Sequence, residues 1–560
     1  MELSQHILER VERVLDYHRA SRLTLASPPT TPEPAPSVYR VFDGHEKIAL
    51  PTSLLDPHVA TLSLLHLGLE ALPDSHMQPP QDLKTLASWL YFAYGIPPGQ
   101  APRGATPVRT AFSGRRLYPC EIYVAAFSIA GLEPGLYHYS VKEFALRKLR
   151  PGSQTLAQIT RGRPDLKFLR TVPGALLVST IFQRSSSKHG RRAFRAAVID
   201  AGHVVQNLVS VASALGIREL VRLVLNENTM RRLIGLSPDA VYGDAESVQA
   251  MVVWADAADA ADTTGARQSI VAAAGPQGMS SAPPQMAEPV DAGWTPIPRL
   301  PLSPAPIEYG SVQAAQLDCV APGMAVRELR PPVTESSPLG ADYPVSELPP
   351  PEEPYGGWPL RKLLLTRPAP VPINTGTISR GTLWTISQLA FRTGTFYPMF
   401  PGGPHIALVR PLWIVSGVVG MDPGVWHYNP IRDRWFAVRY GLFRPDLARA
   451  CQPAEPFTAA AAVCFMIVLL KNLMTQSGPD IYRLAHLEAG YAAQRMLLAS
   501  HAMGLSCHPS VDFFDDEART LLGLGKTEWE PLYAVAVGTT PQATAAPATP
   551  VPQEALPWRG

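Results

Sequence analysis

The chain has 560 residues, of which 46% are apolar and 17% charged, and its formal net charge at pH 7 is +2. This length provides for two or three domains with proper cores, and a net charge so close to zero argues against a nucleic-acid partner. The five cysteines are scattered without a CxxC pair, a usage that fits a reducing cytoplasm. The first residues do not resemble a signal peptide, and the longest apolar run, 457–470, is shorter than the ~20 residues of a membrane helix. We expect a cytoplasmic protein without a membrane partner.

Residues 1–40 form an N-terminal segment, predicted to be an amphipathic helix over 2–20 followed by a proline-rich stretch. A first domain is expected over 41–254 because apolar periodicities and turn residues alternate there. Its predicted elements are a helix at 83–94, strands at 121–129, after the turn at 133–135 and at 175–182, a basic loop at 184–195, a long helix at 198–216 and a closing strand at 251–254.

Residues 255–355 are rich in Ala, Pro and Ser and show little periodicity, which predicts a linker rather than a third domain. A second domain is expected over 356–538, with the apolar run at 457–470 as a buried central strand. Residues 539–560, again rich in Pro, Ala and Thr, are predicted to be a disordered tail.

The two domains repeat each other. The stretch from Arg109 to Tyr139 has the same order as Phe400 to Tyr428: a glycine loop, a proline before an apolar strand, an acidic-Pro-Gly turn and a second strand. The motif Asp-Ala-Gly-His at 200–203 returns as Glu-Ala-Gly-Tyr at 488–491. Landmarks that recur at nearly one offset indicate a duplicated domain. We expect each copy to be a three-layer α+β sandwich, in which helices cover both faces of a mixed central sheet.

These motifs resemble those of a known family. The segment SGRRLYPCE at 113–121, PGLYHY at 134–139, the basic stretch and DAGHVVQNL at 200–208 are similar to the SagB-type dehydrogenases of the nitroreductase superfamily, as is YHRASR at 17–22. The resemblance covers most of 10–254 and the closing half of the second copy. It implies two nitroreductase-like domains, FMN as cofactor, and oxidation of azoline rings to azoles in ribosomally made peptides. In the superfamily two copies pair and flavin binds at their seam, so a tandem chain builds this pseudo-dimer within one polypeptide.

The glycine loop of the first copy is the predicted flavin site. Ser113 and Gly114 lack bulk, which permits close approach to the flavin ring, and Arg109 and Arg115 offer guanidinium groups for its phosphate. The alternative is an ordinary loop leading into a strand, with solvated arginines. In the second copy Gly402 and Gly403 keep the small loop, but no arginine precedes them closely. We therefore expect one complete FMN site per chain.

Lys188 and His189 are the candidate catalytic residues. Azoline oxidation removes a ring proton, and azoline-oxidising members of the family carry a Lys-Tyr pair at this place as a candidate base. A lysine of lowered pKa or a histidine can take up a proton near neutral pH. The alternative is a mobile, solvated loop, which the serines at 185–187 favour. The second copy has Gln476 and Ser477 instead, neither of which is a base.

Two further pairs of residues are better explained by structural roles than by metal binding or catalysis. His138 and His427 occupy equivalent positions of the repeat, but no third ligand has metal-site spacing, so we interpret them as fold determinants and expect no metal. Cys507 and His508 are adjacent on the chain and therefore do not suggest a nucleophile and its base.

Together these patterns predict an FMN-dependent oxidoreductase that dehydrogenates a heterocycle in a peptide natural product. Its substrate is then a modified precursor peptide or a small molecule, and a cyclodehydratase is a candidate partner. Two alternatives stay open: an NAD(P)H-dependent reductase of nitro or quinone compounds, and a partly degenerate scaffold that binds a peptide or other biosynthetic enzymes.

Overall fold

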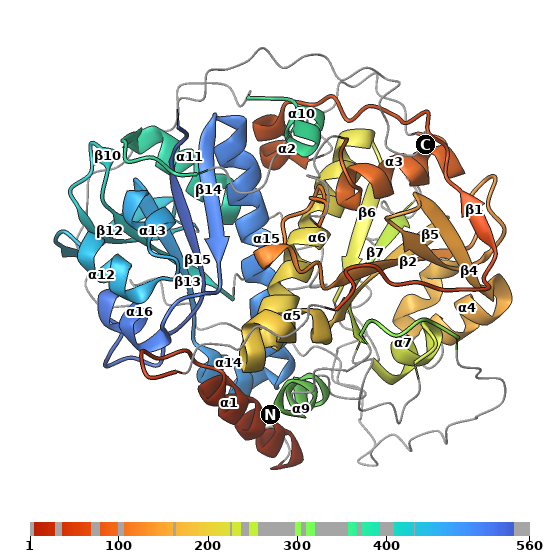
Figure 1. The fold of residues 1–560 in the computed structure, drawn as a ribbon, viewed down its shortest axis with the longest axis horizontal. Coiled ribbons are helices and arrows are strands. Elements are labelled where there is room, and N and C mark those ends of the chain that lie inside the picture. The colour runs from red at the N-terminus through yellow and green to blue at the C-terminus, as the bar shows by residue number, and fades with distance from the viewer. Residues whose placement is uncertain are drawn as a thin grey trace, which may run out of the picture.

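Two β-sheets lie on either side of a central pair of long helices, α6 (Ala193–Leu215) and α15 (Asp480–Ala502) (Figure 1). The structure is a computed structural model. It describes residues 5–27, 36–68, 79–98, 106–160, 164–223, 227–236, 246–255, 297–303, 310–319, 357–366, 372–391, 408–430 and 432–541.

The first sheet belongs to the N-terminal copy and has seven strands in the order β1-β4-β3-β2-β5-β7-β6. The strands are β1 (Lys47–Ala49), β2 (Cys120–Ala126), β3 (Gly135–Ser140), β4 (Ala145–Pro151), β5 (Gly174–Ile181), β6 (Arg218–Arg222) and β7 (Glu246–Ala255). The central strands β2 and β5 are buried along their whole length, because helices cover both faces.

The second sheet repeats this topology with six strands in the order β12-β11-β9-β13-β15-β14. They are β9 (Arg410–Val415), β11 (Gly424–Asn429), β12 (Arg434–Tyr440), β13 (Ala462–Val468), β14 (Leu505–Ser510) and β15 (Glu530–Thr539). The predicted duplication and the buried strand within 457–470 are thereby confirmed. Neighbouring strands in both large sheets are antiparallel, so the expectation of a mixed sheet is wrong in this detail. Among the described strands, parallel pairing occurs in the short ladder of β8 (Ile378–Ser379) with β10 (Val418–Val419).

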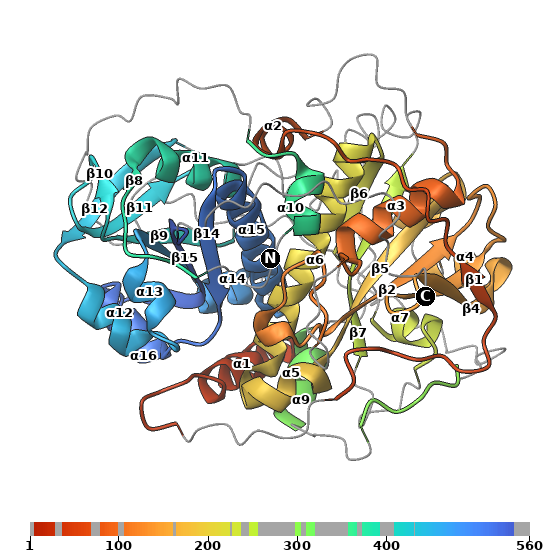
Figure 2. The same ribbon diagram turned by 45° about the horizontal axis from the view of Figure 1, so that its top comes forward.

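Helices complete the layers (Figure 2). The central layer contains α3 (Leu83–Tyr94) and α11 (Arg380–Phe391) beside the two long helices, and its core is continuous across both copies. The outer face of the first sheet is covered by α4 (Gly152–Thr160) and α7 (Glu227–Leu233), and that of the second sheet by α12 (Arg444–Ala450), α13 (Glu455–Ala459) and α16 (Asp515–Leu521). Each copy is thus a three-layer α+β sandwich, and the two copies share the middle layer.

The two long helices touch backbone to backbone, which confirms the expectation that they pack together. They cross at Gly202 and Gly490, one from each repeated motif. A Cβ atom on Gly490 would lie 1.9 Å from the carbonyl oxygen of Ile199, and one on Gly202 would lie 2.1 Å from that of Leu487. Only glycine permits this approach, so the repeated glycine is a requirement of the helix crossing.

The expected basic loop at 184–195 is instead helical. It forms α5 (Phe182–His189), a 3₁₀ turn (Gly190–Arg192) and the start of α6. The serines are buried, and the hydroxyl groups of Ser186 and Ser187 donate hydrogen bonds to carbonyl groups one turn earlier, at Phe182 and Arg184. The sequence suggested a solvated loop because it is polar, whereas its polar groups are satisfied within the helix and by buried partners.

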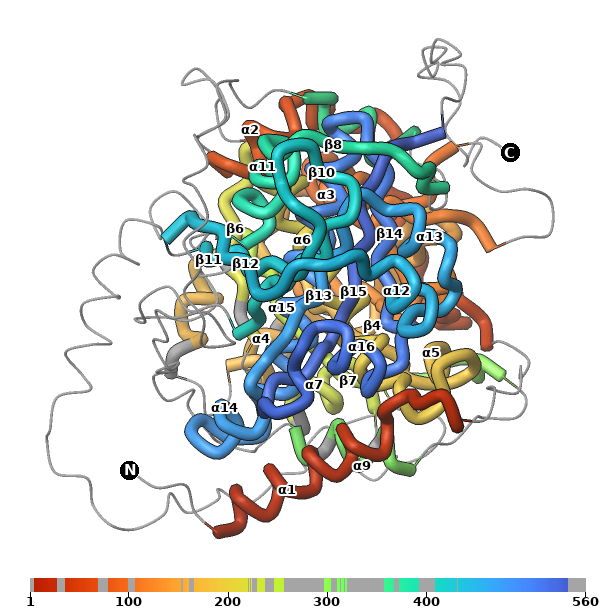
Figure 3. Tube along the Cα trace, turned by 90° about the vertical axis from the view of Figure 1, so that its left-hand side faces the viewer, coloured from red at the N-terminus to blue at the C-terminus, as the bar shows by residue number. Residues whose placement is uncertain are grey.

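The N-terminal helix, α1 (Gln5–Ala20), confirms the prediction for this segment. It lies beside α9 (Gly310–Cys319), a helix within the stretch expected to be an irregular linker (Figure 3). Arg13 donates two hydrogen bonds to Asp318 at 2.8 and 2.9 Å and so joins the two helices. The remaining helices are α2 (Thr61–Leu67), α10 (Leu360–Thr366) and α14 (Leu470–Ser477). Most of the predicted linker, and residues 542–560 of the predicted tail, lie outside the described residues.

Within the described residues, one helical stretch, Phe182–Leu215, is long and apolar enough to cross a membrane by length and composition. The most apolar 18 residues of this stretch are 94% buried within the protein, as in the core helix of a globular fold.

Candidate functional site

The glycine loop of the first copy is tied to helix α6 by one carboxylate. The hydroxyl of Ser113 donates a hydrogen bond of 2.6 Å to Asp200, and the backbone N–H of Gly114 donates one of 3.2 Å to the other oxygen of the same side chain. Ser113 also accepts a bond of 2.9 Å from the backbone N–H of Tyr118. The loop therefore has a fixed shape, set by Asp200.

This loop also has an unusual backbone. Arg115, Arg116 and Tyr118 have φ angles of 51°, 56° and 43°, in the left-handed region that residues with side chains rarely adopt. Such conformations cost of order 1–3 kcal/mol each and persist where the surrounding structure enforces them, often at functional sites. Here the hydrogen bonds to Ser113 and Asp200 help to hold the backbone of the loop in this conformation.

A cavity of about 490 Å³ opens beside the loop, at the junction of the two copies. Its volume lies within the roughly 300–1,000 Å³ of small-molecule sites. The first copy contributes Phe112, Ser113, Gly114, Arg115, Arg116, His189, Ala196 and Asp200, and the second contributes Pro453, His508, Pro509, Ser510, Val511, Asp512 and Tyr533. The cavity thus exists only because the two copies pair.

Asp512 of the second copy contacts an arginine and a histidine of the first. It accepts a hydrogen bond of 2.8 Å from Nε of Arg115, and its other oxygen lies 3.3 Å from Nδ1 of His189. Burial would raise the pKa of this carboxyl, but the hydrogen bonds and charges of His189 and Arg115 outweigh burial and hold the pKa well below its usual range. Asp512 is therefore a stable anion at the cavity wall.

Asp200 has the opposite character. It is buried without a cationic partner among the described residues, and burial raises its pKa to about 7, although the hydrogen bonds from Ser113 and Gly114 oppose the shift. The second copy has the same arrangement of a buried acid on the long helix. Its equivalent residue, Glu488, accepts a hydrogen bond of 2.8 Å from the backbone N–H of Leu408. Burial raises the pKa of Glu488 to about 8. In both copies, a buried acid of the long helix anchors the chain that leads into a strand.

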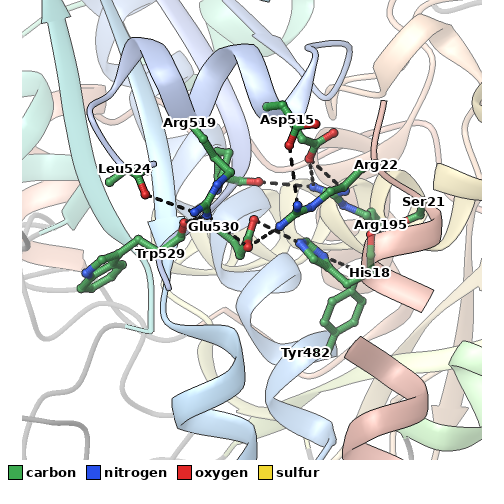
Figure 4. A network of polar contacts seen from close by, with 12 residues as sticks. His18, Ser21, Arg22, Arg195, Tyr482, Asp515, Arg519, Leu524, Trp529 and Glu530 are labelled. Atoms are coloured by element: carbon green, nitrogen blue, oxygen red, sulfur yellow. Dashed lines mark hydrogen bonds and ion pairs between the residues drawn. The ribbon is translucent and has the colours of Figure 1, made fainter. Parts of the chain in front are cut away.

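A buried ionic cluster joins helix α16 to the first copy (Figure 4). Asp515, at the start of α16, pairs with Arg192 and Arg195 of the first copy. Its neighbour Glu530 pairs with Arg22 of the N-terminal segment and, at 3.1 Å, with Arg519. This cluster joins the N-terminal segment to both copies. Its guanidinium groups outnumber its carboxylates, and Nε and Nη2 of Arg192 have no hydrogen-bond partner among the described residues.

The structure brings together half of the predicted site. Ser113, Gly114, Arg115 and His189 all line the cavity. Arg109 lies behind the loop, with its guanidinium 4.7 Å from the ring centroids of both Tyr94 and Tyr118, and it is not among the lining residues. Lys188, in α5, also does not line the cavity. Gly402 and Gly403 lie outside the described residues.

Sequence reasoning missed the contribution of the second copy. His508, Asp512 and Tyr533 come from β14, the turn after it and β15, and no motif marks them as site residues. Asp200 offered a signal, because an acid recurs at Glu488 in the duplicated motif. His138 is buried and lies 2.9 Å from Glu121, and no group of possible metal ligands occurs in the described part of the chain.

Comparison with known proteins identifies the family. The model of the nitroreductase family matches residues 79–252 and 433–539, which together make up half of the chain. The chain belongs to the nitroreductase family. Members of this family depend on FMN, and FMN is the cofactor of this chain. The match falls on both copies, so both halves of the cavity lie in family segments.

The two relatives found by sequence match only parts of the chain, whereas one solved structure matches nearly all of it. "Putative nitroreductase MJ1384" of Methanocaldococcus jannaschii is 26% identical over 155 residues, which are 28% of this chain and 75% of that protein. The trifolitoxin-processing protein TfxB of Rhizobium leguminosarum bv. trifolii is 30% identical over 144 residues, 25% of this chain and only 37% of TfxB. The crystal structure of a "putative nitroreductase" from Anabaena variabilis superposes with a TM-score of 0.67 at 20% identity. The match covers 94% of this chain and 99% of that one. The last comparison shows that the whole two-copy fold recurs.

The residues of the cavity fit FMN. A Cβ on Gly114 would have only Asp200 Oδ1 within 4 Å, at 3.8 Å, so the glycine leaves open space that a flat ring can occupy. Arg116 lines the cavity, so a donor for a phosphate is at hand. The loop of Ser113 and Gly114 would contact the ring, and Arg116 would hold the phosphate.

Proposed function

We propose that this chain is an FMN-dependent dehydrogenase that oxidises azoline rings to azoles in a ribosomally made peptide. The observation that carries the proposal is the position of His189 in the wall of the cavity. Dehydrogenation of an azoline removes a proton as well as a hydride, so a site for this reaction requires a proton acceptor beside the flavin. Histidine is suited to that task near neutral pH.

Bound FMN supplies the acceptor for the hydride. The protein supplies the rest: the loop of Ser113 and Gly114 offers a surface without side chains for the ring, and His189 stands ready to accept the proton. Lys188, in the last turn of α5 beside His189, is the second candidate base. The second copy has Gln476 and Ser477 at these positions, so we assign one catalytic site to the chain.

The proposed substrate is a modified precursor peptide in the cytoplasm, with a cyclodehydratase as the enzyme that forms the azoline. Similarity to TfxB, whose name places it in trifolitoxin processing, supports a role in the maturation of a natural product. The matched stretch spans little more than a third of TfxB. The substrate class therefore depends on the proton acceptor in the cavity as well as on this relative.

The test is direct. The purified chain, loaded with FMN, is incubated with peptides that contain a thiazoline or an oxazoline, and mass spectrometry follows the loss of two hydrogens per ring. Consumption of NADH or NADPH is measured in parallel with a nitro compound and a quinone. Azole formation supports the proposal. Rapid oxidation of NADH or NADPH by the nitro compound or the quinone, without azole formation, would instead identify a reductase. If the purified chain binds no FMN, it is a scaffold.

A further inference from the structure

The carboxylate that contacts His189, that of Asp512, comes from the other copy of the duplicated domain. Oδ1 of Asp512 lies 3.3 Å from Nδ1 of the imidazole, and both side chains are largely buried, with 13% and 3% of their surface exposed. Asp512 is itself fixed, because Arg115 binds its second oxygen and its backbone N–H donates a bond of 2.9 Å to the hydroxyl of Ser510. The orientation of His189 is therefore determined across the junction between the copies.

The other imidazole nitrogen is in a different situation. Nε2 of His189 has no hydrogen-bond partner among the described residues, and His189 lines the cavity. When a carboxylate accepts the N–H of one ring nitrogen, the neutral imidazole keeps its lone pair on the other, and the imidazolium formed on protonation is stabilised by the same carboxylate. This arrangement makes Nε2 the basic atom and directs it away from Asp512.

We propose that Asp512 is a positioning residue that holds His189 in the tautomer protonated at Nδ1, and that Nε2 of His189 is the proton acceptor of the site. The proposal rests on the proposed function and gives the diverged second copy a defined role in it. Lys188 then has a secondary role, because it is not among the residues that line the cavity, whereas His189 is.

The oxidation of one ring balances with bound FMN as the two-electron oxidant, and a second reaction, with oxygen or an oxidised nicotinamide as acceptor, would return the reduced cofactor to its starting state. One C–H bond of the azoline breaks to give a proton, which forms the N–H bond at Nε2 of His189. A second C–H bond gives up its hydrogen with two electrons to bound FMN, so the ring is oxidised and the cofactor reduced. Asp512 keeps its charge throughout and stabilises the imidazolium, and His189 returns the proton to solvent before the next turnover.

Several other groups face the same cavity and must be considered in any pH profile. They are Asp200 on α6, Arg115 and Arg116 on the glycine loop, His508 on β14 and Tyr533 on β15. Asp200 titrates near neutral pH because burial raises its pKa to about 7. Asp200 would therefore contribute to any pH profile near neutral pH, and the decisive measurement should report on the imidazole of His189 itself.

The first experiment uses the protein without FMN. Histidine labelled at its ring nitrogens shows by NMR which nitrogen carries the proton, and His189→Gln assigns the signal. We expect the Nδ1–H tautomer in the parent protein and its loss in Asp512→Asn. Arg115→Gln, which removes the other partner of Asp512, should retain the tautomer. An Nε2–H tautomer in the parent, or a spectrum that Asp512→Asn leaves unchanged, would overturn the proposal.

The second experiment measures azoline oxidation with FMN bound. A positioned base contributes roughly 100- to 10,000-fold, so His189→Gln and Asp512→Asn should each lower kcat by about 100-fold or more with little change in KM. The double variant should lose hardly more than either single one, because the two residues act as a unit. Asp512→Glu should recover part of the activity. Gln476→Ala, at the exposed position equivalent to Lys188, is the matched control.

The outcomes separate this inference from the proposed function. If Lys188→Ala abolishes oxidation while Asp512→Asn retains it, the assignment of the base to His189 is wrong. If the tautomer responds to Asp512→Asn as expected but the parent protein oxidises no azoline, the His189–Asp512 pair is upheld and the substrate assignment fails.

Discussion

The crossing of the two long helices can be tested with a single methyl group. In Gly490→Ala the new Cβ would start 1.9 Å from the carbonyl oxygen of Ile199, whereas real Cβ contacts begin near 3.0 Å, so the backbones must separate by about 1 Å. The obstacle is main chain on both sides, and no change of rotamer can relieve it. The strain therefore passes into the core that both copies share.

The expected magnitude follows from two opposing contributions. Replacing glycine by alanine inside a helix favours the folded state by up to about 1 kcal/mol. Overpacking a well-packed core costs about 1–3 kcal/mol, and contact with rigid backbone should place this site at the upper end. We expect Gly490→Ala to lower the free energy of unfolding by about 2 kcal/mol. Retention of FMN should also weaken, because Asp200, which anchors the glycine loop, lies two residues from the crossing at Gly202.

The assay is urea unfolding followed by circular dichroism, with bound flavin measured by fluorescence. Gly381→Ala in α11 is the matched control, because a Cβ there would have only Ser379 Oγ nearby, at 3.7 Å. This control should be as stable as the parent or more so. If Gly490→Ala unfolds at the same urea concentration as the parent, with the same slope, the crossing can yield at no cost and the close contact does not determine how the copies pair.

Two further predictions concern the acids and the glycine of the site. Gly114→Leu should lose FMN while unfolding at the parental temperature, because its side chain would extend into the cavity rather than into packed protein; a variant that retains the parental flavin content would contradict this placement. Burial raises the pKa of Asp200 to about 7 and that of Glu488 to about 8, so both bind a proton more tightly in the folded chain than in the unfolded one, and the stability that they contribute to the apoprotein should fall as the pH rises from about 4 to about 8. Asp200→Asn should flatten this dependence in urea titrations across that range, and an equally steep profile would show that Asp200 titrates normally.

The fold was largely predictable because its elements are encoded locally and appear twice. The helix at Leu83–Tyr94 and the strand at Gly174–Ile181 have the periodicity and turn residues that mark their types. The helix α5 was not recognised because its sequence, with three serines and flanking basic residues, has the composition of a solvated loop. Its partners, such as Glu121 for Arg184 at 2.6 Å, lie far away in the sequence. Helix α9 was missed for a similar reason, since it depends on packing against α1.

The site was predictable only where one copy supplies it. Ser113 and Gly114 are recognised from their own motif, because lack of bulk is a local property. Asp512 follows a strand that carries no motif, and its proposed role depends on a contact with His189 more than 300 residues away in the sequence. Arg109 illustrates the converse: its charge suggested a phosphate ligand, but it packs between tyrosine rings behind the loop. Charge can be read from a sequence, whereas the direction in which a side chain points cannot.

A fused pair of copies permits an asymmetry that a symmetric dimer cannot have. In a homodimer the two sites between the subunits are identical, so every substitution changes both of them. A position therefore cannot become a base in one site while it only lines the other. In this chain the equivalent positions have separated: His189 lines the cavity, while its counterpart Ser477 lies at the end of α14. The second copy has no base at that place, yet it contributes nearly half of the cavity wall, including Asp512. Its divergence is therefore compatible with an essential part in the first copy's site, and deletion of residues 357–541 should remove that site rather than simplify it.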